Sequence, residues 1–264
     1  IGAYVEKRKE LHRMRGVELY HDSFLNWKQH INRKAQLIIT DPPYNIGRDA
    51  YASNPQWYRD DTKKNGRSRK ANQPFFMSDE DFAEHKLMRF CSEVLQGEPT
   101  EKGKAPCLVI FCSFEQQFLY IKLGREFGFN KYINLVFRKN NSAEALKANM
   151  RIVGCCEYGL VLYRNKLPKF NNDGEMILNC FDYVKDTITP RVHPTQKPVG
   201  LLERLIQIFT DEGDVVIDPC AGSGTTLLAA GNLKREAYGF EIEKEFYEKA
   251  KNTILPCVHP RLFW

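Results

Sequence analysis

The chain has 264 residues, of which 42% are hydrophobic, and its 39 Lys and Arg residues exceed its 33 Asp and Glu residues to give a net charge of +6. This length is enough for one large core, and the charge is compatible with a polyanionic partner without requiring one. No apolar stretch approaches the ~20 residues that span a bilayer, and the first residues are too charged for a signal peptide, so we expect a cytoplasmic protein without a membrane partner.

The eight cysteines are scattered along the chain. They form no C-x2-C pair, and no His/Cys cluster has the spacing of a zinc site. We therefore expect reduced thiols and no metal centre.

The first elements already place an acid at the end of a strand. Residues 1–16 form a basic arm, which we interpret as solvated rather than as a nucleic-acid contact. Residues 17–20 are a short predicted strand, and Asp22 follows it directly. Asp22 is either the N-cap of a helix that begins near Phe24 or an acid that faces a ligand.

The central motif is the stretch Leu37-Ile38-Ile39-Thr40-Asp41-Pro42-Pro43-Tyr44. A short apolar run rich in β-branched residues predicts a strand buried on both faces, and the prolines end it because they cannot donate to a sheet ladder. The loop offers acceptor oxygens beside an aromatic ring, which suits a planar base with an exocyclic amine. A plain proline turn is the alternative interpretation.

A long polar segment follows at residues 48–75. Loops of this length are uncommon unless they act as lids or binding loops or are disordered. Basic residues alternate here with Tyr51, Trp57 and Tyr58, a combination that suits phosphates and bases. We therefore expect it to face DNA through five basic side chains: Lys63, Lys64, Arg67, Arg69 and Lys70.

The next part of the chain alternates helices with strands, which predicts a mostly parallel sheet covered on both faces. Predicted helices cover residues 78–95, capped by Ser78 to Asp81, and 115–127; predicted strands cover 107–111, 132–137 and 153–163. Residues 164–192 break this pattern and predict a small inserted lobe rather than core.

A second motif follows in the last third of the chain. The segment 193–198, His-Pro-Thr-Gln-Lys-Pro, leads into a predicted helix at 199–209, a strand at 213–217, a glycine-rich turn at 218–226 and a helix near Leu227. Leu227 stands where a dinucleotide fingerprint needs its third glycine, and there is no Walker lysine. NAD binding and a plain turn remain the alternatives for a glycine turn alone.

Acidic residues in this motif favour S-adenosylmethionine. Asp218 would repel a pyrophosphate but suits a cationic amino group, and Glu241 has the spacing of an acid that binds ribose hydroxyls. Two predicted strands are therefore each followed by a loop that begins with Asp-Pro, and we expect both loops at the carboxyl ends of the strands, on the same side of the sheet. Together they predict methyl transfer to an exocyclic amine.

These motifs resemble the DNA amino-methyltransferases that modify adenine N6 or cytosine N4, in their β-class arrangement. The resemblance rests, in order, on DPPYNIG at 41–47, HPTQKP at 193–198, DPCAGSGTT at 218–226 and GFEIE at 239–243. It implies a Rossmann-like α/β fold with a seven-stranded, mostly parallel sheet, one reversed strand and circularly permuted motifs. The catalytic half would be 17–163, the target-recognition region 164–192 and the cofactor-binding half 193–264. Cys220 departs from the family, where many members have phenylalanine.

The resemblance also implies roles for individual residues. Asp41 and the Pro42 carbonyl would accept hydrogen bonds from the target amine, and Tyr44 would stack on the base; Pro43 completes the catalytic set. The residues expected to bind S-adenosylmethionine are Asp22, Thr195, Gln196, Lys197, Asp218, Pro219, Cys220, Ala221, Gly222, Ser223, Gly224, Thr225, Thr226, Glu241 and Ile242. Among these, Lys197 is expected near the donor carboxylate, and the match for Asp22 is no stronger than its interpretation as an N-cap.

The expected activity is methylation of the N6 amine of an adenine flipped out of double-stranded DNA, within a restriction-modification context. Methylation of cytosine N4 is the alternative. Two further hypotheses are a catalytically silent DNA-recognition partner of another methyltransferase and a dinucleotide-dependent oxidoreductase. A homodimer and a companion restriction endonuclease are compatible with the resemblance.

Overall fold

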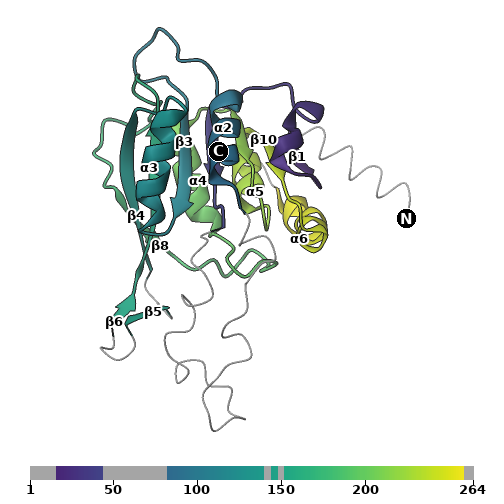
Figure 1. Ribbon diagram of the computed structural model, residues 1–264. Helices are drawn as coiled ribbons and strands as arrows, with labels where there is room; N and C mark the ends of the chain where they lie inside the picture. The colour runs from purple at the N-terminus through teal and green to yellow at the C-terminus, as the bar shows by residue number, and fades with distance from the viewer. Residues whose placement is uncertain (1–15, 44–81, 140–143, 148–151, 259–264) are drawn as a thin grey trace.

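The computed structural model describes residues 16–43, 82–139, 144–147 and 152–258. Helices cover both faces of one large sheet (Figure 1). Its strands are β1 (Val17–Tyr20), β2 (Leu37–Thr40), β3 (Cys107–Cys112), β4 (Lys131–Lys139), β7 (Cys156–Tyr163), β8 (Cys180–Tyr183), β9 (Val215–Asp218) and β10 (Glu236–Phe240). A separate pair, β5 (Glu144–Lys147) and β6 (Ile152–Gly154), extends beyond the end of β4.

The helices divide between the two faces of the sheet. They are η1 (Phe24–Gln29), α2 (Glu84–Val94), α3 (Gln116–Glu126), α4 (Val199–Phe209), α5 (Thr225–Asn232), α6 (Lys244–Lys249), η3 (Ala250–Ile254) and η4 (Leu255–Cys257). One core cluster joins the sheet to α4 and α5, and the other joins it to η1, α2 and α3. The central strands β2, β3 and β9 are buried along their whole length, which explains their continuous apolar sequences.

The sheet has the strand order β1-β10-β9-β2-β3-β7-β4-β8. All neighbouring strands are parallel except at β7, which runs antiparallel to both β3 and β4. The chain leaves β9 through α5 toward β10, and it leaves β2 through α2 toward β3. The connections therefore diverge between β2 and β9, and in open α/β sheets such a switch point forms a crevice beyond the carboxyl ends of the strands.

The predicted Rossmann-like α/β fold with one reversed strand is confirmed, but the predicted number of seven strands is wrong. The described residues contain an eighth strand in this sheet, β8, which pairs parallel with β4. It lies within the segment 164–192, so part of that segment belongs to the sheet rather than to a separate lobe. Its sequence, Cys-Phe-Asp-Tyr, is half polar because it forms an exposed edge.

Two element boundaries also differ from the predictions. Helix α2 begins at Glu84 after Ala83, and residues 82–83 are not helical, so the helix does not start at the predicted cap; residues 78–81 themselves lie outside the described part. The predicted strand 153–163 is divided, since β6 ends at Gly154 and β7 begins at Cys156. The break separates the β5–β6 pair from the main sheet.

Candidate active site

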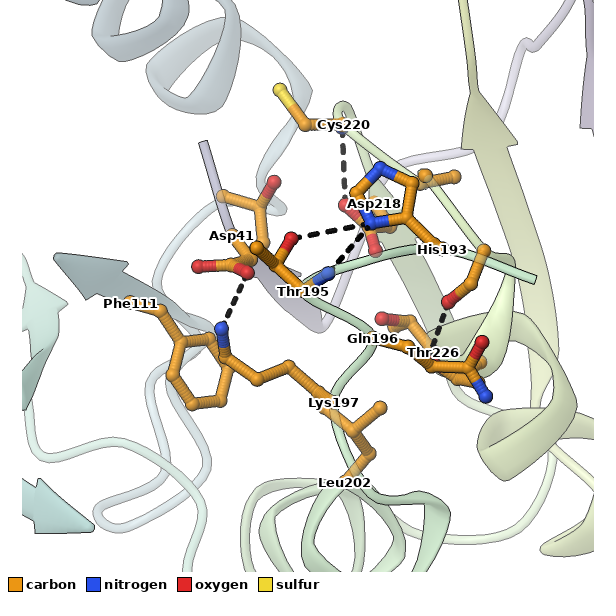
Figure 2. Close-up of a pocket in the computed structure, with 15 residues that line it drawn as sticks. Asp41, Phe111, His193, Thr195, Gln196, Lys197, Leu202, Asp218, Cys220 and Thr226 are labelled. Carbon is orange, nitrogen blue, oxygen red and sulfur yellow. Dashed lines mark hydrogen bonds and ion pairs between the residues drawn. The ribbon is translucent and has the colours of Figure 1, made fainter. Parts of the chain in front are cut away.

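The two Asp-Pro loops end neighbouring parallel strands. Leu37 pairs with Val216 and Ile38 with Ile217, so the chain reaches Asp41 and Asp218 at the same edge of the sheet. Both aspartates line one cavity, and this juxtaposition is the geometry that the sequence predicted (Figure 2). The cavity is formed by Thr40, Asp41, Phe111, His193, Thr195, Gln196, Lys197, Leu202, Asp218, Cys220, Ala221, Gly222, Ser223, Thr225 and Thr226.

Asp218 is the buried acid of this cavity, with 3% of its surface exposed. Burial raises the pKa of Asp218 to about 6, although the N–H of Cys220 donates to Oδ1 over 3.1 Å and the Thr226 hydroxyl acts in the same stabilising direction. The negative charge of Asp41 adds to the increase. A cationic ligand would stabilise the ionised form of such a buried carboxylate strongly, because the cation compensates for the hydration that the carboxylate loses on burial.

The glycine-rich turn passes close to this acid. Gly222 and Gly224 have φ angles of +50° and +76°, a region that favours glycine, and Gly224 precedes the first turn of α5. A Cβ atom on Gly224 would lie 3.2 Å from the Cβ of Ala250. The two glycines therefore allow the backbone to turn tightly beside the cavity.

Glu241 holds this turn in place. Its Oε2 accepts the N–H of Gly222 over 2.8 Å, and its Oε1 accepts the N–H of Glu243 over 2.7 Å. Burial raises the pKa of Glu241. The carboxylate thus links the end of β10 to the turn after β9. Glu241 does not itself line the cavity, and its predicted contact with a ribose stays a prediction.

The segment 193–198 closes the cavity from the other side. His193 lies next to Gly222, its ring meets Phe246 edge-on with centroids 4.3 Å apart, and its Nδ1 accepts the N–H of Thr195 over 3.3 Å. Burial and the Lys197 charge lower the pKa of His193 to about 4, so the imidazole is neutral near pH 7. The cavity between these elements measures about 50 Å³, well below the ~300–1,000 Å³ typical of ligand pockets.

Lys197 contacts the loop at residues 41–43, which follows β2. Its Nζ is 2.5 Å from Oδ2 of Asp41, 3.4 Å from Oε2 of Glu157 and 5.0 Å from the centroid of the Phe111 ring. The two carboxylates outweigh the burial and raise the pKa of Lys197 above its ordinary value. The predicted contact between Lys197 and a donor carboxylate stays a prediction.

The loop at residues 41–43 is also held by α3. The side chain of Gln116 donates from Nε2 to the Pro43 carbonyl over 3.1 Å, and its Oε1 accepts the N–H of Ser113 over 3.1 Å. The loop is described only up to Pro43. Tyr44 and the predicted DNA-facing residues Lys63, Lys64, Arg67, Arg69 and Lys70 lie outside the described residues.

Asp22 lies at the end of β1 but is not the N-cap of η1. Ser23 occupies that position, since its hydroxyl accepts the N–H of Leu25 over 3.3 Å. Asp22 accepts from Nε2 of His30 over 2.7 Å, and hydrogen bonds from His30, Asn26 and Ser23 lower the pKa of Asp22 to about 2. Asp22 lies near Glu241 at the carboxyl ends of the strands, because the Glu241 N–H donates to the carbonyl of Tyr20, the last residue of β1.

Five residues of this region had no role predicted from the sequence. Thr40, Phe111, His193 and Leu202 line the cavity, and Glu157 lies behind Lys197. His193 was already visible as the first residue of its motif. Glu157 carries a weaker signal, an acid at the start of the apolar run that forms β7.

The fold and this cavity define a doubly wound α/β protein with a ligand site at its switch point. The chain belongs to the DNA methylase family N6_N4_Mtase, whose model matches residues 35–252. This match covers both Asp-Pro loops and the segment 193–198. Within the described residues, no group of side chains could hold a metal ion, and no helix is long and apolar enough to cross a membrane.

Several known proteins are similar to this chain. Type II methyltransferase M2.DpnII of Streptococcus pneumoniae is 40% identical over 98 residues, which are 35% of each chain, so the chain matches only about a third of that relative. DNA adenine methyltransferase YhdJ of Escherichia coli K12 is 27% identical over 265 residues, covering 91% of this chain and 83% of that protein.

Two solved structures have a similar fold. The M1.HpyAVI–SAM complex gives a TM-score of 0.63 at 25% identity, covering 89% of this chain and 97% of the other. The cytosine-N4-specific PvuII DNA methyltransferase also gives 0.63, at 16% identity, covering 88% and 84%. At that identity the second likeness concerns the fold alone.

Proposed function

We propose that this protein is a DNA methyltransferase that transfers a methyl group from S-adenosylmethionine to the N6 amine of an adenine flipped out of duplex DNA. The observation that carries the proposal is the common cavity of Asp41 and Asp218 at the switch point between β2 and β9. Membership in the N6_N4_Mtase family supports it.

The residues around Asp218 fit S-adenosylmethionine chemically. The Asp218 carboxylate suits the donor's ammonium group, Glu241 suits its ribose hydroxyls, and the turn at Gly222 and Gly224 lets the backbone approach closely. When bound, this donor supplies an electrophilic methyl group on a sulfonium. The SAM complex of M1.HpyAVI supports the choice of donor.

The residues around Asp41 suit the acceptor. The exocyclic nitrogen of adenine is a poor nucleophile because its lone pair is conjugated with the ring. Hydrogen bonds from the amine to Asp41 and to the Pro42 carbonyl would favour tetrahedral geometry and stabilise the positive charge that develops during transfer. No covalent enzyme intermediate is required.

Access to this amine requires the base to leave the duplex, which costs a few kcal/mol. In our proposal Tyr44 stacks on the flipped base, and this stacking offsets about 1–3 kcal/mol of the cost of flipping. Lys63, Lys64, Arg67, Arg69 and Lys70 would bind phosphates, and the region 164–192 would read the target sequence. A homodimer and a companion endonuclease belong to the same proposal.

Adenine is favoured over cytosine by two observations. The loop begins with Asp41, and the family resemblance implies adenine for Asp at this position, since cytosine-modifying members more often carry serine there. YhdJ, named as an adenine methyltransferase, matches most of this chain. The cytosine-N4-specific PvuII enzyme has the same fold, and the chemistry at Asp41 suits either amine.

The test is a nucleoside digest of unmodified duplex DNA after incubation with the protein and S-adenosylmethionine. Mass spectrometry should detect N6-methyladenine. N4-methylcytosine as the sole product would replace the adenine assignment, and donor binding without any methylated nucleoside would favour the silent recognition partner.

A further inference from the structure

A row of four alternating charges crosses the sheet edge behind the cavity. Lys139, at the end of β4, contacts Glu157 on β7; Glu157 contacts Lys197, which contacts Asp41 at the end of β2. The inner residues are shielded from solvent, with side-chain exposures of 7% for Lys197 and 16% for Glu157. The row therefore connects the catalytic loop to a residue that does not line the cavity.

Burying these charges is costly for the fold. An ion pair in the interior often contributes less stability than apolar side chains of the same volume would. The surroundings are apolar, since the Lys197 ammonium lies over the Phe111 ring and Glu157 pairs across the sheet with buried Phe137. Burial alone would raise the pKa of Glu157, but Lys197 and Lys139 outweigh it, so Glu157 stays ionised. A functional reason for the arrangement is therefore worth testing.

The charge on Lys197 creates a problem for methyl transfer. Its ammonium is 2.5 Å from Asp41, the carboxylate that has to stabilise a positive charge on the target amine. A lone Lys197 would cancel the charge of Asp41 and weaken it as an acceptor. With Glu157 included, the group formed by Asp41, Lys197 and Glu157 carries a net charge of −1. Lys139 adds a positive charge at the far end of the row, where it contacts Glu157; its charge therefore acts on Asp41 over a longer distance than that of Lys197, which contacts Asp41 directly.

We propose that Glu157 is a positioning residue for methyl transfer, which balances and orients Lys197 so that Asp41 keeps its negative field toward the target amine. This inference rests on the proposed function, because it assigns Asp41 to the acceptor. Glu157 itself touches neither substrate. It acts through Lys197, whose ammonium is held between Glu157, Asp41 and the Phe111 ring.

The first test is the isosteric variant Glu157→Gln in single-turnover methyl transfer to duplex DNA. We expect the transfer rate to fall by about ten- to a hundredfold, as is usual for residues that support a reactive group. The dissociation constant for S-adenosylmethionine, measured by calorimetry, and the KM for DNA should stay within about twofold of wild type, because Glu157 does not line the cavity. Glu157→Asp, which keeps the charge, should recover part of the rate.

The matched control is Asp214→Asn. Lys169 is another buried lysine held by two carboxylates, at 2.7 Å from Asp211 and 2.8 Å from Asp214. This group lies at the amino end of β9, whereas the cavity lies at its carboxyl end. Loss of a buried ion-pair partner in the Lys169 group should lower the thermal stability of the protein and leave the rate of methyl transfer unchanged. Equal loss of transfer in both variants would mean that Glu157 is merely structural.

A double-mutant cycle with Lys197→Met tests whether Glu157 acts through Lys197. Because the unbalanced ammonium is then gone, Glu157→Gln should change the rate by less than about threefold in that background. This comparison also remains informative if the single variant folds poorly, since the double variant buries no unpaired lysine.

Three outcomes would overturn the inference alone. They are wild-type transfer by Glu157→Gln, equal loss of transfer in Glu157→Gln and Asp214→Asn, and the same fold-loss from Glu157→Gln with and without Lys197→Met. If the wild-type protein transfers no methyl group to any DNA, the proposed function fails and this inference fails with it.

Discussion

At the scale of single residues, the role proposed for Asp218 predicts that donor binding depends on pH. Its pKa is about 6 in the protein, because burial disfavours the ionised form. Only that form attracts the donor's ammonium group. S-adenosylmethionine affinity should therefore be nearly constant above pH 7 and about tenfold lower at pH 5, where about a tenth of Asp218 is ionised. Titration calorimetry between pH 5 and 8 measures this dependence.

The control for this prediction is Asp218→Asn. It should bind the donor weakly, with little change in affinity between pH 5 and 7, since the titrating group is gone. The linkage has the opposite sign for the free protein: a folded-state pKa raised from 3.8 to about 6 means that ionising Asp218 costs stability as pH rises through this interval. Affinity that rises toward pH 5 would contradict the proposed role of Asp218.

The residues found from sequence share a local signature. Asp41, Asp218 and Glu241 each follow an apolar strand, so pattern and position alone place them at the ligand edge of the sheet. Glu157 has no such signature, because its partner Lys197 is 40 residues away in sequence and meets it only through the fold. Tyr44 remains a prediction, since it lies outside the described residues.

At the scale of elements, the packing of α5 on β10 leaves no room for a side chain at Gly239. A Cβ atom there would lie 2.7 Å from Cδ1 of Leu227 and 3.0 Å from the Cβ of Ala221. Gly239→Ala should therefore destabilise the protein by about 1–3 kcal/mol, the usual cost of overpacking a core. It should also weaken donor binding, because Ala221 belongs to the cavity lining. Urea unfolding and titration calorimetry measure the two effects.

Gly200→Ala is the matched control. Gly200 lies in the first turn of α4, and a Cβ atom there would have no neighbour within 4 Å. Alanine favours a helix over glycine, so this variant should be as stable as wild type or up to about 1 kcal/mol more stable. If Gly239→Ala behaved in the same way, the close contact between α5 and β10 would not limit the fold.

Elements with strong local signals were predicted well. Helix α4 has its predicted bounds, Val199–Phe209, because Pro198 precedes a strongly amphipathic sequence. The course of the chain through 164–192 was not predicted, since β8 is held by backbone pairing with β4 and its side chains are largely exposed. Helix α2 starts later than its apparent cap, which shows that a local capping signal does not fix where a helix begins.

At the scale of the whole molecule, the sheet brings together two halves of the chain. Asp41 follows β2 in the first half, Asp218 is the last residue of β9 in the second, and the pairing of these strands places both acids in one cavity. The alternation of strands and helices predicted the sheet, and the order of motifs predicted which loops would meet. The family resemblance predicted one reversed strand without saying which. The structure shows that it is β7, whose direction depends on contacts between distant segments.

The central claim is that Asp41 serves transfer while Asp218 and its turn serve donor binding. The most direct measurement is transfer of a labelled methyl group from S-adenosylmethionine to duplex DNA by Asp41→Ala, with donor affinity measured on the same preparation. We predict no detectable transfer and a dissociation constant within about threefold of wild type, because the Asp41 acceptor is lost while the donor site remains. Turnover at the wild-type rate in this variant would contradict the account.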